Sequence, residues 1–163
     1  MQKFLAGGFT LIELMIAIVI IALLTTVALP GYLEHLAKSR RAEGRNALLM
    51  AAQLQERFYT TRVPTVGDPI RYAQNAELPA LFGLGGGPVY SGENPVLNTG
   101  HYTITVDAPT AACPIASCFV LTATPNGRHA PDTRCGLLTL SSTGVRTTTG
   151  THTPDALGYC WGK

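Results

Sequence analysis

The sequence predicts an α+β fold in which one long N-terminal helix packs on a small antiparallel β-sheet with a disulfide-stapled C-terminal loop. A strongly apolar stretch, residues 9–29, runs into a second stretch, 30–61, whose apolar residues recur at helical spacing. The last part of the chain, 101–163, contains short apolar segments separated by turn residues, and all four cysteines lie there. A sheet of this size needs a cover, and the amphipathic half of the helix provides one.

The length and the net charge of the chain restrict its domain organisation and its expected partners. The chain has 163 residues, of which 46% are hydrophobic and 13% charged, as expected for one compact domain plus one apolar element. The formal net charge of +2 falls to +1 if residues 1–8 are removed, because Lys3 leaves with them. A balance so close to neutral gives no general reason to bind nucleic acid, which we therefore expect to be an unlikely partner.

The apolar stretch 9–29 has the length of a membrane-spanning helix, about 30 Å. Residues 1–8 before it are too few to fold and are typical of a removable leader. A secretory signal cut after Thr26-Val27-Ala28 is one alternative, and an uncleaved anchor is another. Glu13 disfavours both, since a carboxylate in lipid is costly and is normally retained for a partner.

The orientation in the membrane is not settled by charge. Lys3 precedes the apolar stretch, whereas Lys38, Arg40, Arg41 and Arg45 follow it, which by the positive-inside rule would leave the C-terminal part in the cytoplasm. The cysteines favour an exported domain instead. We follow the cysteines, because Glu34 and Glu43 partly offset the basic residues.

In the second half of the helix, 30–61, Pro30 is expected to cause a kink, and Gly31 and Gly44 are further flexible positions. Charged residues here, such as Glu34, Lys38, Arg41 and Arg45, are expected to form a solvated face. The following segment, 62–100, is rich in Gly and Pro and is predicted to be an irregular connection, either packed and functional or partly mobile.

The cysteines match no zinc-binding spacing, so disulfides are expected. Four cysteines allow three pairings. We prefer Cys113–Cys118, which closes a short loop containing proline, and Cys135–Cys160, which ties the end of the chain to a strand. Four strands are predicted, at 101–107, 118–124, 135–141 and, shorter, 145–148, in an antiparallel meander. Residues alternate in the first of them, so Tyr102, Ile104 and Val106 are expected to share one face.

No catalytic or metal-binding set is evident in the sequence, and we expect neither enzymatic activity nor a cofactor. Histidines and aspartates of the C-terminal part lack the spacing of a triad or a metal site: His101, His129, His152, Asp107, Asp132 and Asp155. Four basic residues there are expected to be ordinary solvated surface: Arg128, His129, Arg134 and Arg146.

The run Gly8-Phe9-Thr10-Leu11-Ile12-Glu13-Leu14-Met15 resembles the prepilin cleavage motif of type IV pilins and pseudopilins. The resemblance implies that a membrane prepilin peptidase cuts between Gly8 and Phe9 and methylates the new N-terminus. It also implies that Glu13 faces the Phe9 amine of a neighbouring subunit in the filament.

Further segments are similar to minor pilins of the PilE kind: Lys38 to Glu43, Ala47 to Leu49, Gln55 to Tyr59, Ala123 to Pro125, Asp132, Cys135 to Leu140, Gly144 and Cys160-Trp161. Cys113, Cys118 and much of 62–100 depart from that pattern. The resemblance implies a subunit that supports pilus assembly, and hence twitching motility, adhesion or DNA uptake. A pseudopilin of type II secretion, or a tip protein that binds DNA or a surface, is the alternative.

The same resemblance implies partners and a location. The partners are the prepilin peptidase, other pilin subunits, the inner-membrane assembly platform and, before assembly, membrane lipid. The precursor is expected in the inner membrane of a Gram-negative bacterium as a single-pass protein with a periplasmic domain, and the mature chain in an extracellular pilus.

Overall fold

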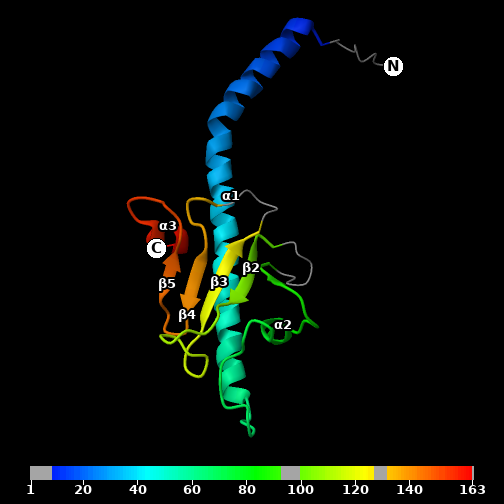
Figure 1. Cartoon of the computed structure of the whole chain (residues 1–163). Coiled ribbons are helices and arrows are strands. Elements are labelled where there is room, and N and C mark those ends of the chain that lie inside the picture. The colour runs from blue at the N-terminus through cyan, green and yellow to red at the C-terminus, as the bar shows by residue number, and fades with distance from the viewer. Residues whose placement is uncertain (1–8, 93–99, 127–131, 163) are drawn as a thin grey trace, which may run out of the picture. The chain divides into compact units, whose positions relative to one another are not determined.

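The computed structural model describes residues 9–92, 100–126 and 132–162. Its elements follow the chain in this order: α1 (Leu11–Thr61), α2 (Leu78–Leu81), β1 (Val89–Tyr90), β2 (Tyr102–Val106), β3 (Val120–Pro125), β4 (Leu138–Ser141), β5 (Arg146–Thr148) and α3 (Ala156–Trp161). Contacts divide the chain into two units, Met1–Ala37 and Lys38–Lys163 (Figure 1).

The first unit contains the apolar part of α1. Its best 18-residue window has a mean hydropathy of 2.7 with no residue buried, so by length and composition it is able to cross a membrane. The helix begins where Thr10 accepts a hydrogen bond from the Glu13 backbone N–H at 3.3 Å, an N-terminal cap. It continues through Pro30 without a break in the helical assignment, and the kink expected there stays a prediction.

The second unit is built on a five-stranded sheet whose order, β1-β2-β3-β4-β5, follows the chain, with every pair antiparallel (Figure 1). This confirms the predicted meander. The shared face predicted for β2 is also confirmed: Tyr102, Ile104 and Val106 are buried, whereas Thr103 and Thr105 are less so. The register places Leu121 opposite Leu140, which aligns the buried residues of β3 and β4.

The second half of α1 covers one face of the sheet, as Figure 1 shows, and supplies Leu48 and Ala51 to the core. Gly44 is part of the contact. A Cβ at this position would lie 2.8 Å from Cδ2 of Tyr102, so the absent side chain lets the helix approach the ring. Gly44 is thus a close-packing position, a role that was not predicted from the sequence.

The segment 62–100 is not wholly irregular where it is described. It contains α2 and β1, and it buries Tyr72, Ala73, Leu78 and Val89 in or beside the core. The sequence left open whether this segment is packed or partly mobile, and over 62–92 it is packed. β1 was not predicted, because a two-residue strand between Gly87-Pro88 and Gly92 is too short to show alternation.

The C-terminal loop contains a short helix, α3, which sequence analysis did not predict. Asp155 caps it by accepting a hydrogen bond from the Gly158 N–H at 2.8 Å. Trp161 is buried at its end and donates from Nε1 to the Thr147 carbonyl at 3.0 Å, which fastens α3 to β5. Disulfides join Cys113 to Cys118 and Cys135 to Cys160, the two preferred pairs.

Candidate assembly and interaction sites

The exposed apolar surface of α1 is the largest candidate interaction surface. Phe9 is 76% exposed, and every large apolar side chain from Leu11 to Leu29 is exposed as well: Leu11, Ile12, Leu14, Met15, Ile16, Ile18, Val19, Ile20, Ile21, Leu23, Leu24, Val27 and Leu29. Glu13 is the acidic residue of the first helical turn. Gly8, the predicted cleavage position, lies outside the described residues. An apolar surface this continuous requires lipid or other protein around it.

A buried ion pair joins α1 to the segment before β4. Nε and Nη2 of Arg41 donate to the two carboxylate oxygens of Asp132, the second bond at 3.0 Å. The Arg41 side chain is 3% exposed, and its guanidinium also lies over the Tyr159 ring, 4.6 Å from the centroid. Burial opposes the charge, but hydrogen bonds with Asp132 and Tyr159 outweigh it and raise the Arg41 pKa.

The neighbouring contacts bind both ends of the Cys135–Cys160 loop. The backbone N–H of Cys135 donates to the Asp132 carbonyl at 3.2 Å, and Nη1 of Arg45 donates to the Cys160 carbonyl at 3.2 Å. One turn of α1 therefore holds the disulfide-linked segment through Arg41 and Arg45. We call Arg41, Arg45, Asp132 and Tyr159, together with this disulfide, the C-terminal clamp.

A second polar cluster joins α1 to the sheet beside β1. Glu43 Oε1 accepts from the Ser91 hydroxyl at 2.5 Å and from the His101 backbone N–H at 3.0 Å, and Oε2 lies 2.5 Å from His101 Nδ1. Burial opposes ionisation of Glu43, but these hydrogen bonds outweigh it and lower its pKa. These contacts fasten Glu43 of α1 to Ser91, which follows β1, and to His101, which precedes β2.

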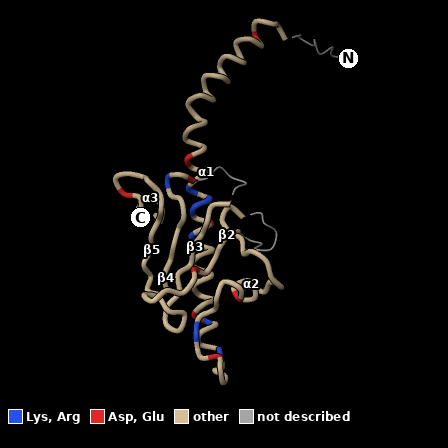
Figure 2. Tube along the Cα trace, viewed as in Figure 1, with Lys and Arg blue, Asp and Glu red and all other residues tan. Residues whose placement is uncertain are grey.

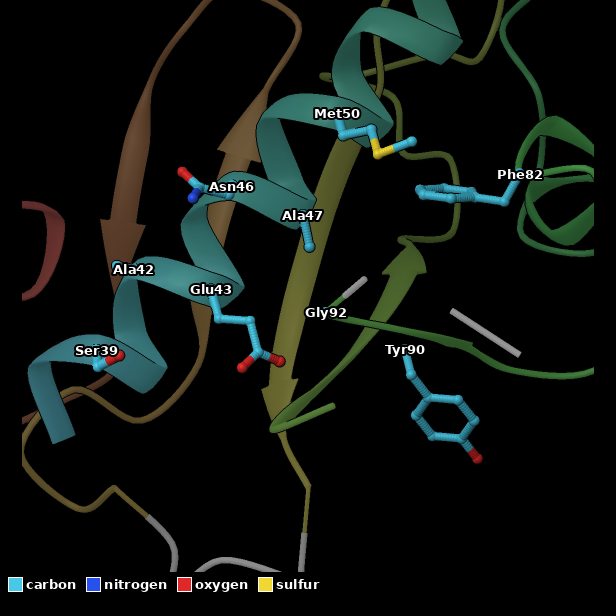
Figure 3. A pocket seen from close by; sticks show the side chains of 9 residues that line it. All are labelled: Ser39, Ala42, Glu43, Asn46, Ala47, Met50, Phe82, Tyr90 and Gly92. Carbon is cyan, nitrogen blue, oxygen red and sulfur yellow. The ribbon is translucent and has the colours of Figure 1, made fainter. Parts of the chain in front are cut away.

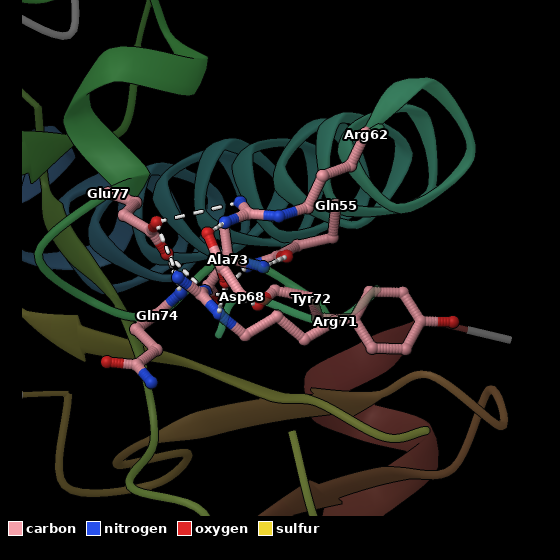
Figure 4. A network of polar contacts seen from close by, with 8 residues as sticks. All are labelled: Gln55, Arg62, Asp68, Arg71, Tyr72, Ala73, Gln74 and Glu77. Atoms are coloured by element: carbon pink, nitrogen blue, oxygen red, sulfur yellow. Dashed lines mark hydrogen bonds and ion pairs between the residues drawn. The ribbon is translucent and has the colours of Figure 1, made fainter. Parts of the chain in front are cut away.

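A third cluster holds the segment after α1 against the end of that helix (Figure 4). The Gln55 side chain pairs with the backbone of Ala73 in both directions, at 2.9 and 2.8 Å, and is fully buried. Nearby, Arg71 makes a two-fold hydrogen bond to Glu77, at 2.6 and 2.9 Å, and this bond lowers the Glu77 pKa. The cluster explains why 62–77 packs without long regular elements.

The basic residues of the C-terminal part are only partly described. Arg128 and His129 lie outside the described residues. Arg134 donates to the Tyr159 hydroxyl at 3.1 Å, and the Arg146 guanidinium lies 5.3 Å from the Trp161 ring centroid. Elsewhere, basic and acidic positions are interleaved along the second half of α1 (Figure 2). Within the described ranges, no group of three or more His, Cys, Asp or Glu side chains is placed to hold a metal ion.

The contacts that Arg41, Glu43 and Asp132 make with distant parts of the chain were not predicted from the sequence. It placed Arg41 on a solvated face, and that was wrong, because Arg41 is 2% exposed as a residue. One signal was present in the sequence. Arg41 belongs to the row that α1 buries, with the spacing of one helix face: Arg41, Gly44, Leu48, Ala51 and Gln55.

An apolar N-terminal helix, a helix-covered antiparallel meander and a disulfide-closed C-terminal segment together define the class of type IV pilins. Residues 5–29 match the family model of the prokaryotic N-terminal methylation motif. Residues 30–139 match the model described as type IV minor pilin ComP, DNA uptake sequence receptor. Because this second match covers more than half of the chain, the protein belongs to that family of type IV minor pilins.

Individual relatives match over shorter stretches. The type IV major fimbrial protein FimA of Dichelobacter nodosus is 52% identical over 43 residues, 26% of this chain and 27% of FimA. Fimbrial protein EcpC of Eikenella corrodens is 50% identical over 46 residues, 28% of this chain and 30% of EcpC. The match thus spans under a third of these relatives. A solved type IV pilin from Shewanella oneidensis is 26% identical and covers 72% of this chain and 97% of its own, with a TM-score of 0.38.

Proposed function

We propose that this protein is a minor subunit of a type IV pilus, which is cut between Gly8 and Phe9 and joins the filament through α1. The observation that carries the proposal is the exposed apolar surface from Leu11 to Leu29, which contains one carboxylate, Glu13, and lies within the match to the N-terminal methylation motif. The family match favours a pilus over a secretion pseudopilus.

Glu13 has a specific part in this proposal. Cleavage would create a positively charged amine on Phe9, and a lone charge of either sign is costly once the apolar surfaces of adjacent helices exclude water. Pairing Glu13 of one subunit with the Phe9 amine of its neighbour satisfies both charges. The pair would also set how far one helix is displaced along the next, while small and apolar side chains make the remaining contacts.

The proposal also names the partners of the protein and its location before and after assembly. The precursor is held by α1 in the inner membrane with its folded domain in the periplasm, where disulfides form. The prepilin peptidase then processes it, and the assembly platform passes it from lipid to the other pilin subunits. The subunit acts by polymerisation and without catalysis, and through the pilus it supports twitching motility or adhesion.

The test is the intact mass of the protein from membranes and from sheared filaments. We expect a chain that begins at Phe9 and carries one added methyl group in both fractions. A chain that begins at Leu29 would indicate ordinary secretion, and a chain that keeps residues 1–8 would show that no maturation occurs. Either of these results contradicts the proposal.

Capture of DNA is a second candidate function, favoured by the description of the matching family model as a DNA uptake sequence receptor. In this chain the candidate surface lies around α3 and β5, where Arg134 and Arg146 stand beside the aromatic rings of Tyr159 and Trp161. Guanidinium groups next to aromatic rings are suited to phosphates and bases. The near-neutral net charge means that such binding would depend on this local surface.

Titration of the detergent-solubilised, full-length chain with duplex DNA tests this second function. We expect micromolar binding that weakens as salt rises, and a weaker affinity in Arg146→Gln, which removes one exposed positive charge. Arg57→Gln, an exposed change on α1, is the matched control and should bind like the unchanged chain. Failure to bind DNA at low salt, or equal losses in both variants, would rule out the surface around β5.

A further inference from the structure

A groove lies beside α1 in the folded domain, between the helix and the segment that contains α2 and β1. Its volume is 480 Å³, and Figure 3 shows Met50 of α1 and Phe82 pointing toward each other across it. The lining residues are Ser39, Ala42, Glu43, Asn46, Ala47, Met50, Phe82, Tyr90 and Gly92.

The α1 side of the groove is formed largely by short side chains. Ser39, Ala42 and Asn46 recur at intervals of three and four residues, and Ala47 adjoins Asn46, so these short side chains share one side of the helix and let another backbone come close. The opposite wall is aromatic, from Phe82 and Tyr90. Such a shape suits an elongated partner with branched apolar side chains.

The charged side chain that lines the groove, Glu43, already has hydrogen-bond partners. Glu43 makes its hydrogen bonds to Ser91 and His101 on the sheet side, so its carboxylate does not require a cationic partner. Met50 is 51% exposed, and beside it on α1 Leu49 is 42% exposed. About half of each of these two apolar side chains is therefore left uncovered by the described residues, and a flexible methionine adapts readily to a partner surface.

We propose that this groove receives the apolar N-terminal helix of a neighbouring pilin subunit. The chain itself carries such a helix, in which the large apolar residues from Leu11 to Leu29 are all exposed and need a cover outside lipid. A helix lies in a groove through side chains at intervals of three, four and seven residues, a spacing that a uniformly apolar helix offers on every side. The inference rests on the proposed function. Beyond the packing of helix on helix, it proposes a second contact, between the helix of one subunit and the folded domain of another.

The first experiment is photo-crosslinking in piliated cells that make the full-length chain. A benzophenone-bearing amino acid replaces Met50 in the groove or, as a matched control, Val145, which is 58% exposed just before β5. We expect a crosslink from position 50 to a pilin subunit, at a peptide within that subunit's apolar helix. Position 145 should not crosslink to that helix.

The second experiment fills the groove. Ala42→Phe should lower the amount of this chain in sheared filaments at least about fivefold, because a large side chain takes the space of the incoming helix. Ala112→Phe, on an exposed loop, is the control and should incorporate normally. Protease resistance of the folded domain in membranes shows whether the Ala42→Phe variant still folds. If the variant does not fold, the crosslinking experiment at position 50 still tests the inference.

The outcomes separate this inference from the proposed function. If the chain enters filaments but position 50 crosslinks to a neighbour's folded domain, to a non-pilin protein or to nothing, the groove does not receive a helix and the subunit role stands. If the unchanged chain never enters filaments, the proposed function fails first. Normal incorporation of a folded Ala42→Phe variant would also overturn the inference.

Discussion

Glu13→Ala is expected to leave cleavage between Gly8 and Phe9 intact and to reduce incorporation into filaments by about a hundredfold or more, since an unpaired buried charge costs several kcal/mol. The Phe9 amine of the adjoining subunit would then lie among apolar side chains without a counter-charge. The amount of the mature chain in sheared filaments, relative to membranes, measures the effect.

Gly8→Asp is the matched control for this prediction, because it should block cleavage, the step before assembly. Glycine at the cut site lets an extended backbone enter a narrow cleft, and a charged side chain there should leave the precursor uncut. The two variants should therefore differ in mass, with a mature chain for Glu13→Ala and a full-length one for Gly8→Asp. Normal piliation in both would contradict the assembly mechanism.

Asp132→Ala is expected to destabilise the folded domain by about 3 kcal/mol or more, because it leaves the buried Arg41 guanidinium without its main counter-charge. The same change removes the acceptor that anchors the segment before β4. Urea unfolding of the full-length chain in mild detergent, followed by fluorescence, measures the loss. Trp161, the chain's single tryptophan, is buried in α3 and reports directly on the C-terminal clamp.

Two comparisons make the Asp132 prediction specific. Asp107→Ala, at an exposed position after β2, should change the free energy of unfolding by less than about 0.5 kcal/mol. The double variant Arg41→Met with Asp132→Leu should be more stable than Asp132→Ala alone, because no unpaired charge stays buried. If Asp132→Ala unfolds at the same urea concentration as the unchanged chain, the clamp does not stabilise the domain.

The strands show which parts of the fold could be predicted from the sequence pattern alone. Alternating Tyr102, Ile104 and Val106 predicted both a strand and its buried face, and the turn residues between segments predicted the meander. β1 and α3 carry no comparable signal. A two-residue strand is too short to alternate. α3 has a local cap in Asp155, but it also depends on the contact of Trp161 with Thr147 of β5, which lies outside the helix.

Local sequence by itself determined the N-terminal helix and the methylation motif, because a continuous apolar run and the one carboxylate within it are read from adjacent residues. Tertiary structure alone decided the roles of Arg41, Glu43, Asp132 and the groove beside α1. Charged residues on a helix have the same local pattern whether they face water or a partner. Only the approach of the sheet and of the disulfide-linked segment, across about 90 positions of sequence, removes Arg41 from water and pairs it with Asp132.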